Sequence, residues 1–326
     1  MSAGIERVDR LSRLPAMPNL AVIINCGTRW VSTLALVSLR ARSDWPILVI
    51  DCESKDGSRA HFEQLSRRHG LHFHWLDWPL RPHGRTLDRL FDEVPAGQVL
   101  LVDSDVEIRD AAVLAAMQES LAADPSAYGA GFLHGPEWMG EAHGLPPHVG
   151  WYAQRMWIPL VLLRTAAIRE ARAVGESFLQ RREFREIAGH PGLSRALGLR
   201  FWIPGLRGLR RRGDGTPEHA AFVEFDTGAA MHRCLAGFDH GLATPSRDLL
   251  CQVHHYHGVS RAQRRWRPRK LAERLHLAGM ANDVAQDAIV DEVRARLARV
   301  YAIDLAALDR AWPTDCHEST GKESLE

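Results

Sequence analysis

The sequence is poor in cysteine, and none of its cysteines belongs to a C-x-x-C pair. The five cysteines are Cys26, Cys52, Cys234, Cys251 and Cys316. An odd number of widely spaced cysteines argues against a disulfide framework. We therefore expect free thiols in a reducing compartment.

Long hydrophobic runs are also missing. The longest apolar runs, such as residues 158–163, are far shorter than the roughly 20 residues of a membrane-spanning helix. The N-terminal segment carries charges at Glu6, Arg7 and Asp9 and lacks the apolar core of a signal peptide. The sequence thus predicts a cytoplasmic protein.

The chain has no strong excess of charge of either sign. It contains 41 Lys and Arg against 40 Asp and Glu, a net charge of +1, so its composition does not indicate a nucleic-acid partner. Two glycine-rich phosphate cradles are absent as well: there is no G-x-x-x-x-G-K-[ST] string, and no G-x-G-x-x-G follows the first expected strand. A protein of this kind that binds a diphosphate needs another way to neutralise it.

What the sequence does contain is an alternation of apolar strands and amphipathic helices. Strands are expected at 20–25, 46–51, 71–77 and 98–105, and helices at 30–42, 58–70 and 84–94. This order predicts an α/β fold, Rossmann-like, with a mostly parallel central sheet covered by helices on both faces.

The second half of the chain is less regular. It predicts a helix at 111–124, a strand at 127–135, a strand followed by a helix within 158–174, and a helix at 226–237. We divide the chain into one large domain (1–258), a C-terminal helical extension (259–313) and a disordered tail (314–326). Within the large domain, residues 20–135 form a nucleotide-binding half and residues 136–258 an acceptor half.

Polar residues gather where the expected strands end. Asn25 ends the first strand, Asp51 the second, Asp77 the third and Asp103 the fourth. In open α/β sheets, ligands bind outside the carboxyl ends of the strands. Because crowded carboxylates repel one another unless a cation or hydrogen-bond donors share the site, this rim predicts a binding site.

The segment VDSDVEI at 102–108 is the sharpest motif. Asp103 and Asp105, two residues apart just past a strand, can both approach one divalent ion, and carboxylate oxygens suit Mg²⁺ or Mn²⁺. A strand that ends in an Asx-type turn is the plain alternative.

The order of strand, VIDCESKDGS, helix, HGRTLD, strand and VDSDVEI resembles the nucleotide-sugar half of a GT-A fold glycosyltransferase, closest to the family 2-like inverting enzymes. The resemblance covers residues 20–135 well and continues more weakly to about 258. It implies that a nucleotide-diphospho-sugar is bound by nine residues: Asn25, Asp51, Ser54, Asp56, Gly84, Arg85, Asp88, Asp103 and Ser104. It also implies that Asp105 is the direct metal ligand, with Asp103 contacting the ribose or the metal through water. Cys52 departs from the family pattern, which has a polar residue such as Asn there.

The same resemblance implies a general base about a hundred residues after the metal motif, near the start of a helix. Asp226 and Glu224 are the candidates, and Glu137 is another. Asp226 is also suited to cap the helix that follows it. A late histidine often completes the metal site in such enzymes, and the resemblance favours His257 for that role. A histidine-rich loop with only local hydrogen bonds is the alternative.

Two basic stretches complete the sequence signals. Residues 199–212 mix arginines with Phe201 and Trp202, which suits a loop that closes over an acceptor or contacts an anionic membrane surface peripherally. Residues 260–270 could clamp a diphosphate or an anionic acceptor, or they are solvated arginines on a loop. Trp138, Trp151 and Trp157 could stack on sugar rings or belong to the core.

Together these features predict a metal-dependent glycosyltransferase that uses Mn²⁺ or Mg²⁺, with inversion at the sugar carbon. Its acceptor would be a saccharide, a lipid-linked saccharide or another hydroxyl compound. One rival is a sugar-phosphate nucleotidyltransferase, which should have a glycine-rich basic loop after the first strand, where this chain has Arg29 but a single glycine. A second rival is a non-catalytic protein of the same fold that binds a nucleotide sugar.

Overall fold

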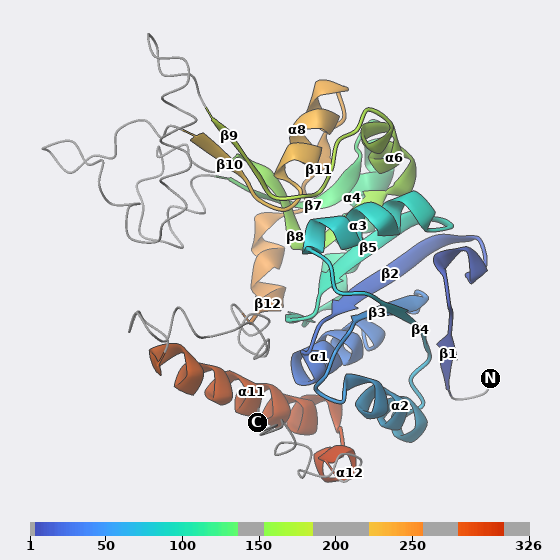
Figure 1. The fold of residues 1–326 in the computed structure, drawn as a ribbon, viewed down its shortest axis with the longest axis vertical. Helices are drawn as coiled ribbons and strands as arrows, with labels where there is room; N and C mark the ends of the chain where they lie inside the picture. The colour runs from blue at the N-terminus through green and yellow to red at the C-terminus, as the bar shows by residue number, and fades with distance from the viewer. Residues whose placement is uncertain (1–3, 136–152, 185–221, 257–279, 310–326) are drawn as a thin grey trace, which may run out of the picture.

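The computed structural model describes residues 4–135, 153–184, 222–256 and 280–309 (Figure 1). Within these ranges, no helix combines the length and apolar character needed to cross a bilayer.

An eight-stranded sheet forms the centre of the protein, in the order β1-β4-β3-β2-β5-β8-β7-β11. Its strands are β1 (Ile5–Arg7), β2 (Met17–Asn25), β3 (Ile47–Cys52), β4 (Phe73–Trp78), β5 (Ala96–Asp103), β7 (Gly129–His134), β8 (Arg155–Arg164) and β11 (Leu242–Ala243). The first five strands in this order are parallel, whereas β8 runs antiparallel to both β5 and β7. The predicted α/β fold with a mostly parallel central sheet is therefore confirmed.

Alternate residues of the central strands face opposite sides of the sheet. On β2, Ala21 and Ile23 belong to one buried apolar cluster, whereas Leu20 and Val22 belong to the other. This two-residue period, with both faces apolar, is what a doubly covered parallel sheet requires.

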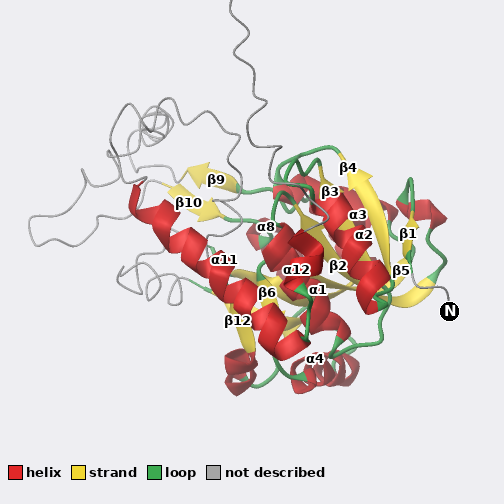
Figure 2. Ribbon diagram, turned by 90° about the horizontal axis from the view of Figure 1, so that it is seen from below, coloured by secondary structure: helices red, strands yellow, loops and turns green. Residues whose placement is uncertain are grey.

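Helices cover both faces of the sheet (Figures 1 and 2). One face carries α1 (Arg29–Arg40), α2 (Ser58–His69), α4 (Ala111–Ala123), α11 (Met280–Tyr301) and α12 (Leu305–Asp309). The other face carries the short 3-10 helix η1 (Leu11–Arg13), α3 (His83–Glu93), α6 (Thr165–Ala173) and α8 (Ala229–Gly237).

The C-terminal helices pack directly on the nucleotide-binding half of the chain. Helix α11 contacts α1, and α12 contacts α2. Val293 and Leu297 of α11 are fully buried in the same apolar cluster as the side chains of α1. The helical character expected for this part of the chain is confirmed for these two helices.

Two small antiparallel sheets flank the central one. β9 (Arg181–Phe184) pairs with β10 (Phe222–Phe225), and β6 (Val106–Ile108) pairs with β12 (Val253–His255), which follows the short 3-10 helix η3 (Arg247–Gln252). The second pair matters for the site because β6 directly follows the Asp103–Asp105 turn.

The start of α2 agrees with the sequence expectation, whereas the start of α8 differs from it. Ser58 is the first residue of α2, and the cap position is Gly57 with φ of 76°. Helix α8 begins at Ala229 after Gly228, whose φ of 83° favours glycine, so Asp226 is not the helix cap. Helix α2 ends at His69, one residue before the end of the expected range, and Gly70 follows it in a left-handed conformation.

Candidate active site

The register of the parallel strands brings their polar ends to one level of the rim. Asn25 pairs with Asp51 and Asp51 with Asp77, while Ile24 pairs with Asp103. The gathering of polar residues expected from the sequence is therefore met at the carboxyl edge of β2, β3, β4 and β5.

A group of two carboxylates and one imidazole lies at this edge. Ligand atoms of Asp103, Asp105 and His255 all lie within 4.8 Å of one another. The Nε2 atom of His255 is 3.2 Å from Oδ1 of Asp105. This proximity follows from the β6–β12 pairing, in which His255 faces Val106 and the N–H of Tyr256 donates to the carbonyl of Asp105 at 2.9 Å.

The charges of this group are poorly compensated. Asp105 is buried, and 29% of the Asp103 side chain reaches solvent. Desolvation raises the pKa of Asp103 above its ordinary value; His83 opposes this shift, and the neighbouring Asp105 adds to it. A bound cation would remove this penalty. Two hard oxygen donors with one imidazole nitrogen form a donor set that fits Mn²⁺, and the carboxylates also fit Mg²⁺.

A pocket opens beside this group, between the ends of β2, β3 and β5 and the start of α3. Its volume is about 90 Å³. Its lining residues are Ile24, Cys26, Thr28, Cys52, Leu80, Arg81, His83, Thr86, Asp103, Ser104 and Asp105. This volume suits a hydrated ion or a phosphate group, since sites for larger ligands typically measure about 300–1,000 Å³.

Side chains of the polar segment after β3 form hydrogen bonds within their own loop and to the end of β2. Asp51 accepts from the Asn25 side chain at 2.5 Å through Oδ1 and from the Ser54 N–H at 3.0 Å through Oδ2. Ser54 Oγ in turn accepts from the Gly27 N–H at 2.7 Å. Burial raises the pKa of Asp51, and its hydrogen bonds to Ser54 and Asn25 oppose the shift. These contacts account for much of the polar character at 51–58.

Asp56 has a similar structural part. Its backbone carbonyl accepts from the Arg29 guanidinium at 2.7 Å, and its carboxylate accepts from the N–H groups of Arg29 and Ser58. The one basic residue that a nucleotidyltransferase loop would have used, Arg29, thus ties α1 to the 53–57 turn.

The start of α3 places different residues in the pocket from those expected. Gly84 packs against backbone, because a Cβ there would meet the carbonyl oxygen of Phe178 at 2.6 Å. Asp88 is buried and accepts from the Ser177 hydroxyl at 2.6 Å and the Phe178 N–H at 2.9 Å. Exposed Arg85 lies 3.6 Å from Asp88.

The residues that reach the pocket from this segment are Arg81, His83 and Thr86. His83 is the first residue of α3, and its Nε2 lies 4.0 Å from Oδ1 of Asp103. The sequence reasoning missed all three. The signal was available, since a helix that starts just after β4 begins at the same rim as the acidic strand ends.

Of the candidate bases, Asp226 has a described environment. Its Oδ2 forms an ion pair with Arg155 at 3.0 Å, and its Oδ1 accepts from the Thr227 N–H. Arg155 is also close enough to Asp103 to lower the pKa of that group. Glu224 lies on β10, where it is opposite Arg182 of β9 in the strand register.

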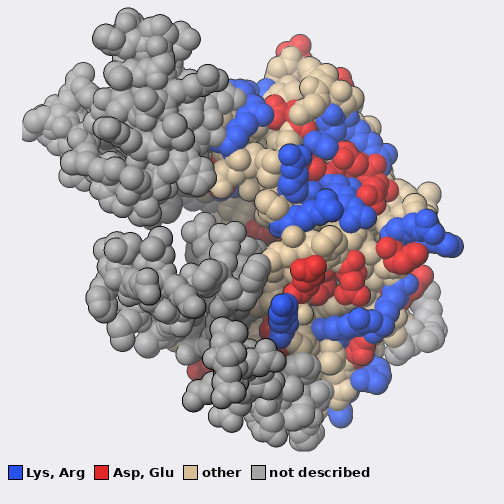
Figure 3. Space-filling view, in the orientation of Figure 1, with Lys and Arg blue, Asp and Glu red and all other residues tan. Residues whose placement is uncertain are grey.

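Several predicted residues lie outside the described ranges: His257, Glu137, Trp138, Trp151 and the basic stretches 199–212 and 260–270. The structure places His255, two residues before His257, in the group that could hold a metal ion. Trp157 is buried, with its ring 5.8 Å from that of His255. On the face shown in Figure 3, acidic and basic side chains are interspersed over the described part.

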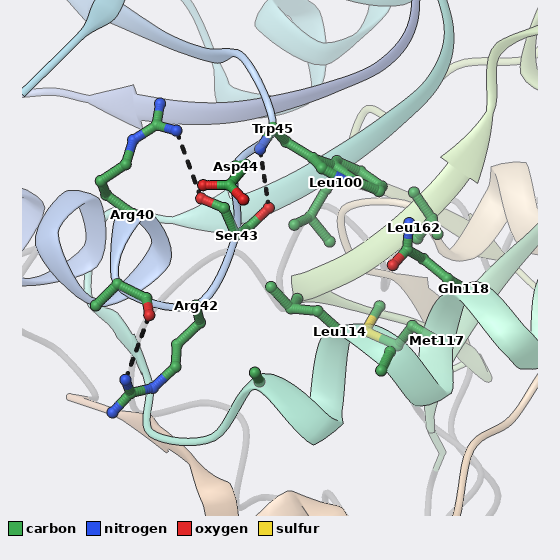
Figure 4. Close-up of a pocket in the computed structure, with 13 residues that line it drawn as sticks. Arg40, Arg42, Ser43, Asp44, Trp45, Leu100, Leu114, Met117, Gln118 and Leu162 are labelled. Atoms are coloured by element: carbon green, nitrogen blue, oxygen red, sulfur yellow. Dashed lines mark hydrogen bonds between the residues drawn. The ribbon is translucent and has the colours of Figure 1, made fainter.

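A larger pocket, of about 550 Å³, lies elsewhere, between the C-terminal end of α1, the 41–45 loop and α4 (Figure 4). Leu100, Leu114 and Leu162 line its apolar part. The guanidinium groups of Arg40 and Arg42 at this pocket donate to backbone carbonyls. Its lining has no histidine and a single carboxylate, that of Asp44, so the chemistry points to the smaller pocket at the strand ends.

No family model matches the sequence, and no curated protein matches it. Several solved structures show some likeness. TarS from S. aureus shares 17% identity with a TM-score of 0.34, and the match covers 48% of this chain and 49% of that one. The mannosyltransferase PcManGT from Pyrobaculum calidifontis, solved with GDP-Man and Mn²⁺, shares 13% identity with a TM-score of 0.38 over 93% of this chain and 76% of that one. The galactosyltransferase LgtC, solved with donor and acceptor sugar analogues, shares 12% identity with a TM-score of 0.32 over 45% of this chain and 58% of that one.

The chain thus matches only about half the length of TarS. At these identities and TM-scores, the function has to be argued from the site itself.

Proposed function

We propose that this protein is a metal-dependent glycosyltransferase that moves a sugar from a nucleotide-diphospho-sugar to an acceptor hydroxyl, with inversion at the sugar carbon. One observation carries the proposal: Asp103, Asp105 and His255 converge at the carboxyl edge of a parallel sheet, beside a pocket. That edge is where open α/β sheets bind their ligands.

Asp105 and His255 would hold Mn²⁺ or Mg²⁺ directly, and Asp103 would contact it directly or through water. When bound, the ion neutralises charge on the diphosphate as that group leaves. The crowding of the two carboxylates supports this role: desolvation and the neighbouring Asp105 raise the pKa of Asp103, and a cation would stabilise the ionised form.

The donor would extend beyond the small pocket. Its nucleoside would lie along the segment of Asn25, Asp51, Ser54 and Asp56, whose loop is already held in place by its own hydrogen bonds. A rigid loop of this kind lowers the entropy cost of binding. Arg81 and His83, at the pocket, are suited to the phosphates.

Asp226 is our candidate for the general base. In the reaction, the acceptor oxygen attacks the sugar carbon, its proton passes to a carboxylate, and the bond from that carbon to the diphosphate oxygen breaks. The ion pair with Arg155 supports this role, since it fixes the orientation of the Asp226 carboxylate. The acceptor, a saccharide, lipid-linked saccharide or other hydroxyl compound, would enter from the half of the chain after residue 135.

The test is metal binding followed by turnover. Mn²⁺ binding to the wild-type protein is measured by electron paramagnetic resonance, and hydrolysis of nucleotide sugars is screened across donors with and without Mn²⁺. Asp105→Ala should abolish Mn²⁺ binding and metal-dependent donor binding while the protein stays folded. Asp77→Asn is the control, because Asp77 lies near the carboxyl end of β4, another strand of the same sheet, but outside the three-residue group.

Turnover of a donor that requires Mn²⁺ supports an enzyme. Binding of a donor without turnover of any would favour a non-catalytic binding protein instead. Mn²⁺ binding by Asp105→Ala at wild-type affinity would refute the metal assignment.

A further inference from the structure

Glu107 is a fully buried carboxylate that has no part in the proposed chemistry. It lies on β6, two residues after Asp105, and is 0% exposed. Its Oε1 accepts from the Arg296 Nε–H and, at 2.8 Å, from the Tyr301 hydroxyl; its Oε2 lies 3.2 Å from the Arg109 Nε. A buried charge of this kind is costly unless it is fully paired, and here three donors share it.

Two of those donors belong to the C-terminal helix. Arg296 and Tyr301 are on α11, and Arg296 is 189 residues away from Glu107 in sequence. In Figure 2, α11 passes beside β6 and α1. Glu107 therefore links α11 to β6, the strand that follows the Asp103–Asp105 turn.

That strand sets the geometry of the metal-ligating group. β6 and β12 are only three residues long each, and their pairing puts Glu107 opposite His254 and so one residue from His255. An isolated two-stranded pair of this size is not stable alone in water. Helix α1 supports β6 because Val106 and Ile108 are buried in the apolar cluster that contains the α1 side chains, and the Ile108 N–H donates to the Ser38 hydroxyl. Glu107 adds the support from α11.

We propose that Glu107, with Arg296 and Tyr301, is a positioning group that holds the β6–β12 pair so that Asp105 and His255 stay within ligating distance of one ion. The proposal rests on the metal site proposed above. It makes α11 a part of that site, although none of the helix's described side chains belongs to the metal-ligating group.

The experiment compares Mn²⁺ affinity, measured by electron paramagnetic resonance well below the melting temperature, in the full-length wild type, Glu107→Gln and Tyr301→Phe. Gln keeps the shape of Glu and can still accept one hydrogen bond, but it leaves Arg296 and Arg109 without a counter-charge. Loss of outer support typically costs metal affinity about 10- to 100-fold, and we expect a loss in that range for Glu107→Gln. Tyr301→Phe removes one hydrogen bond, and we expect a loss of about two- to tenfold.

The control variant is Asp309→Asn. Asp309 lies on α12 and pairs with Arg294 of α11 at 2.7 Å, so its ion pair joins these two helices and does not include Glu107. This variant tests whether the loss of any ion pair of α11 lowers Mn²⁺ affinity. We expect its Mn²⁺ affinity to stay within about twofold of wild type. A second readout is the nitrogen modulation of the Mn²⁺ spin echo from His255, which should weaken in Glu107→Gln and persist in Asp309→Asn.

The outcomes separate the two proposals. No Mn²⁺ binding by the wild type overturns the metal site itself. Wild-type binding with unchanged affinity in folded Glu107→Gln overturns the positioning role alone. If Glu107→Gln does not fold, Tyr301→Phe decides, and an unchanged affinity in that variant overturns the positioning role.

Discussion

The buried histidine at position 61 should make the stability of this protein depend on pH. His61 lies on α2 and is 4% exposed. Its Nε2 is 2.7 Å from the Thr33 hydroxyl, and its ring meets that of Trp30 edge-on at 4.7 Å. Desolvation, with a smaller effect of Arg29, lowers the pKa of His61 to about 3.

The sign and the size of the change in stability with pH follow from this pKa shift. The folded protein keeps His61 neutral, whereas the unfolded chain takes up a proton as pH falls below the ordinary value of 6.5. The stabilisation is therefore fully present above pH 6.5 and is lost as pH falls toward 3. Between pH 7.5 and pH 5 the loss amounts to about 2 kcal/mol, since each unit below the unfolded pKa contributes about 1.4 kcal/mol.

The assay is urea unfolding of the wild type and His61→Asn at these two pH values. Asn can still bond to Thr33 but does not titrate, and the other histidines are common to both proteins. We expect the free energy of unfolding of the wild type to fall by about 2 kcal/mol more than that of the variant. An equal fall in the two proteins would show that His61 titrates normally and would refute the reasoning.

Two further predictions concern the site and its support. Asp226→Asn should slow sugar transfer by about 10²- to 10⁴-fold while Mn²⁺ affinity stays unchanged, because it removes a base but no metal ligand. Steady-state kinetics measure the rate of transfer, and titration followed by electron paramagnetic resonance measures the Mn²⁺ affinity. A wild-type rate would exclude Asp226 as the base. Gly84→Ala should lower the melting temperature and the free energy of unfolding, by about 1–3 kcal/mol, because the new Cβ would lie 2.6 Å from the Phe178 carbonyl oxygen. Gly237→Ala is the control, since nothing lies within 4 Å of a Cβ there. If both glycine variants melt like the wild type, Gly84 is not needed for close packing.

The sheet was largely predictable because its signal is local. The apolar runs within 20–25, 46–51 and 98–105 consist of consecutive residues, and the strands begin and end within three residues of those positions. The place of β8 is different. Its antiparallel insertion between β5 and β7 depends on pairing between distant segments, and no local pattern encodes that.

For the candidate site too, the local sequence pattern was predictable, whereas contacts between distant segments were not. The spacing of Asp103 and Asp105 predicts two members of the group that could hold a metal ion, but the presence of His255 in that group depends on the register of β12 against β6. The same holds for Asp51, whose hydrogen bonds to Asn25 and Ser54 only the folded chain reveals. A polar cluster in sequence looks alike whether its members bind a ligand or one another.

The fastening of α11 to β6 also bears on how the protein matures on the ribosome. Translation proceeds from the N-terminus, so the acidic turn emerges well before Arg296, which lies 189 residues beyond Glu107. Until α11 is made, a nascent chain would carry Glu107 with Arg109 but without its partners Arg296 and Tyr301. On the proposed role of Glu107, full affinity for the ion would then be acquired only after α11 has been synthesised.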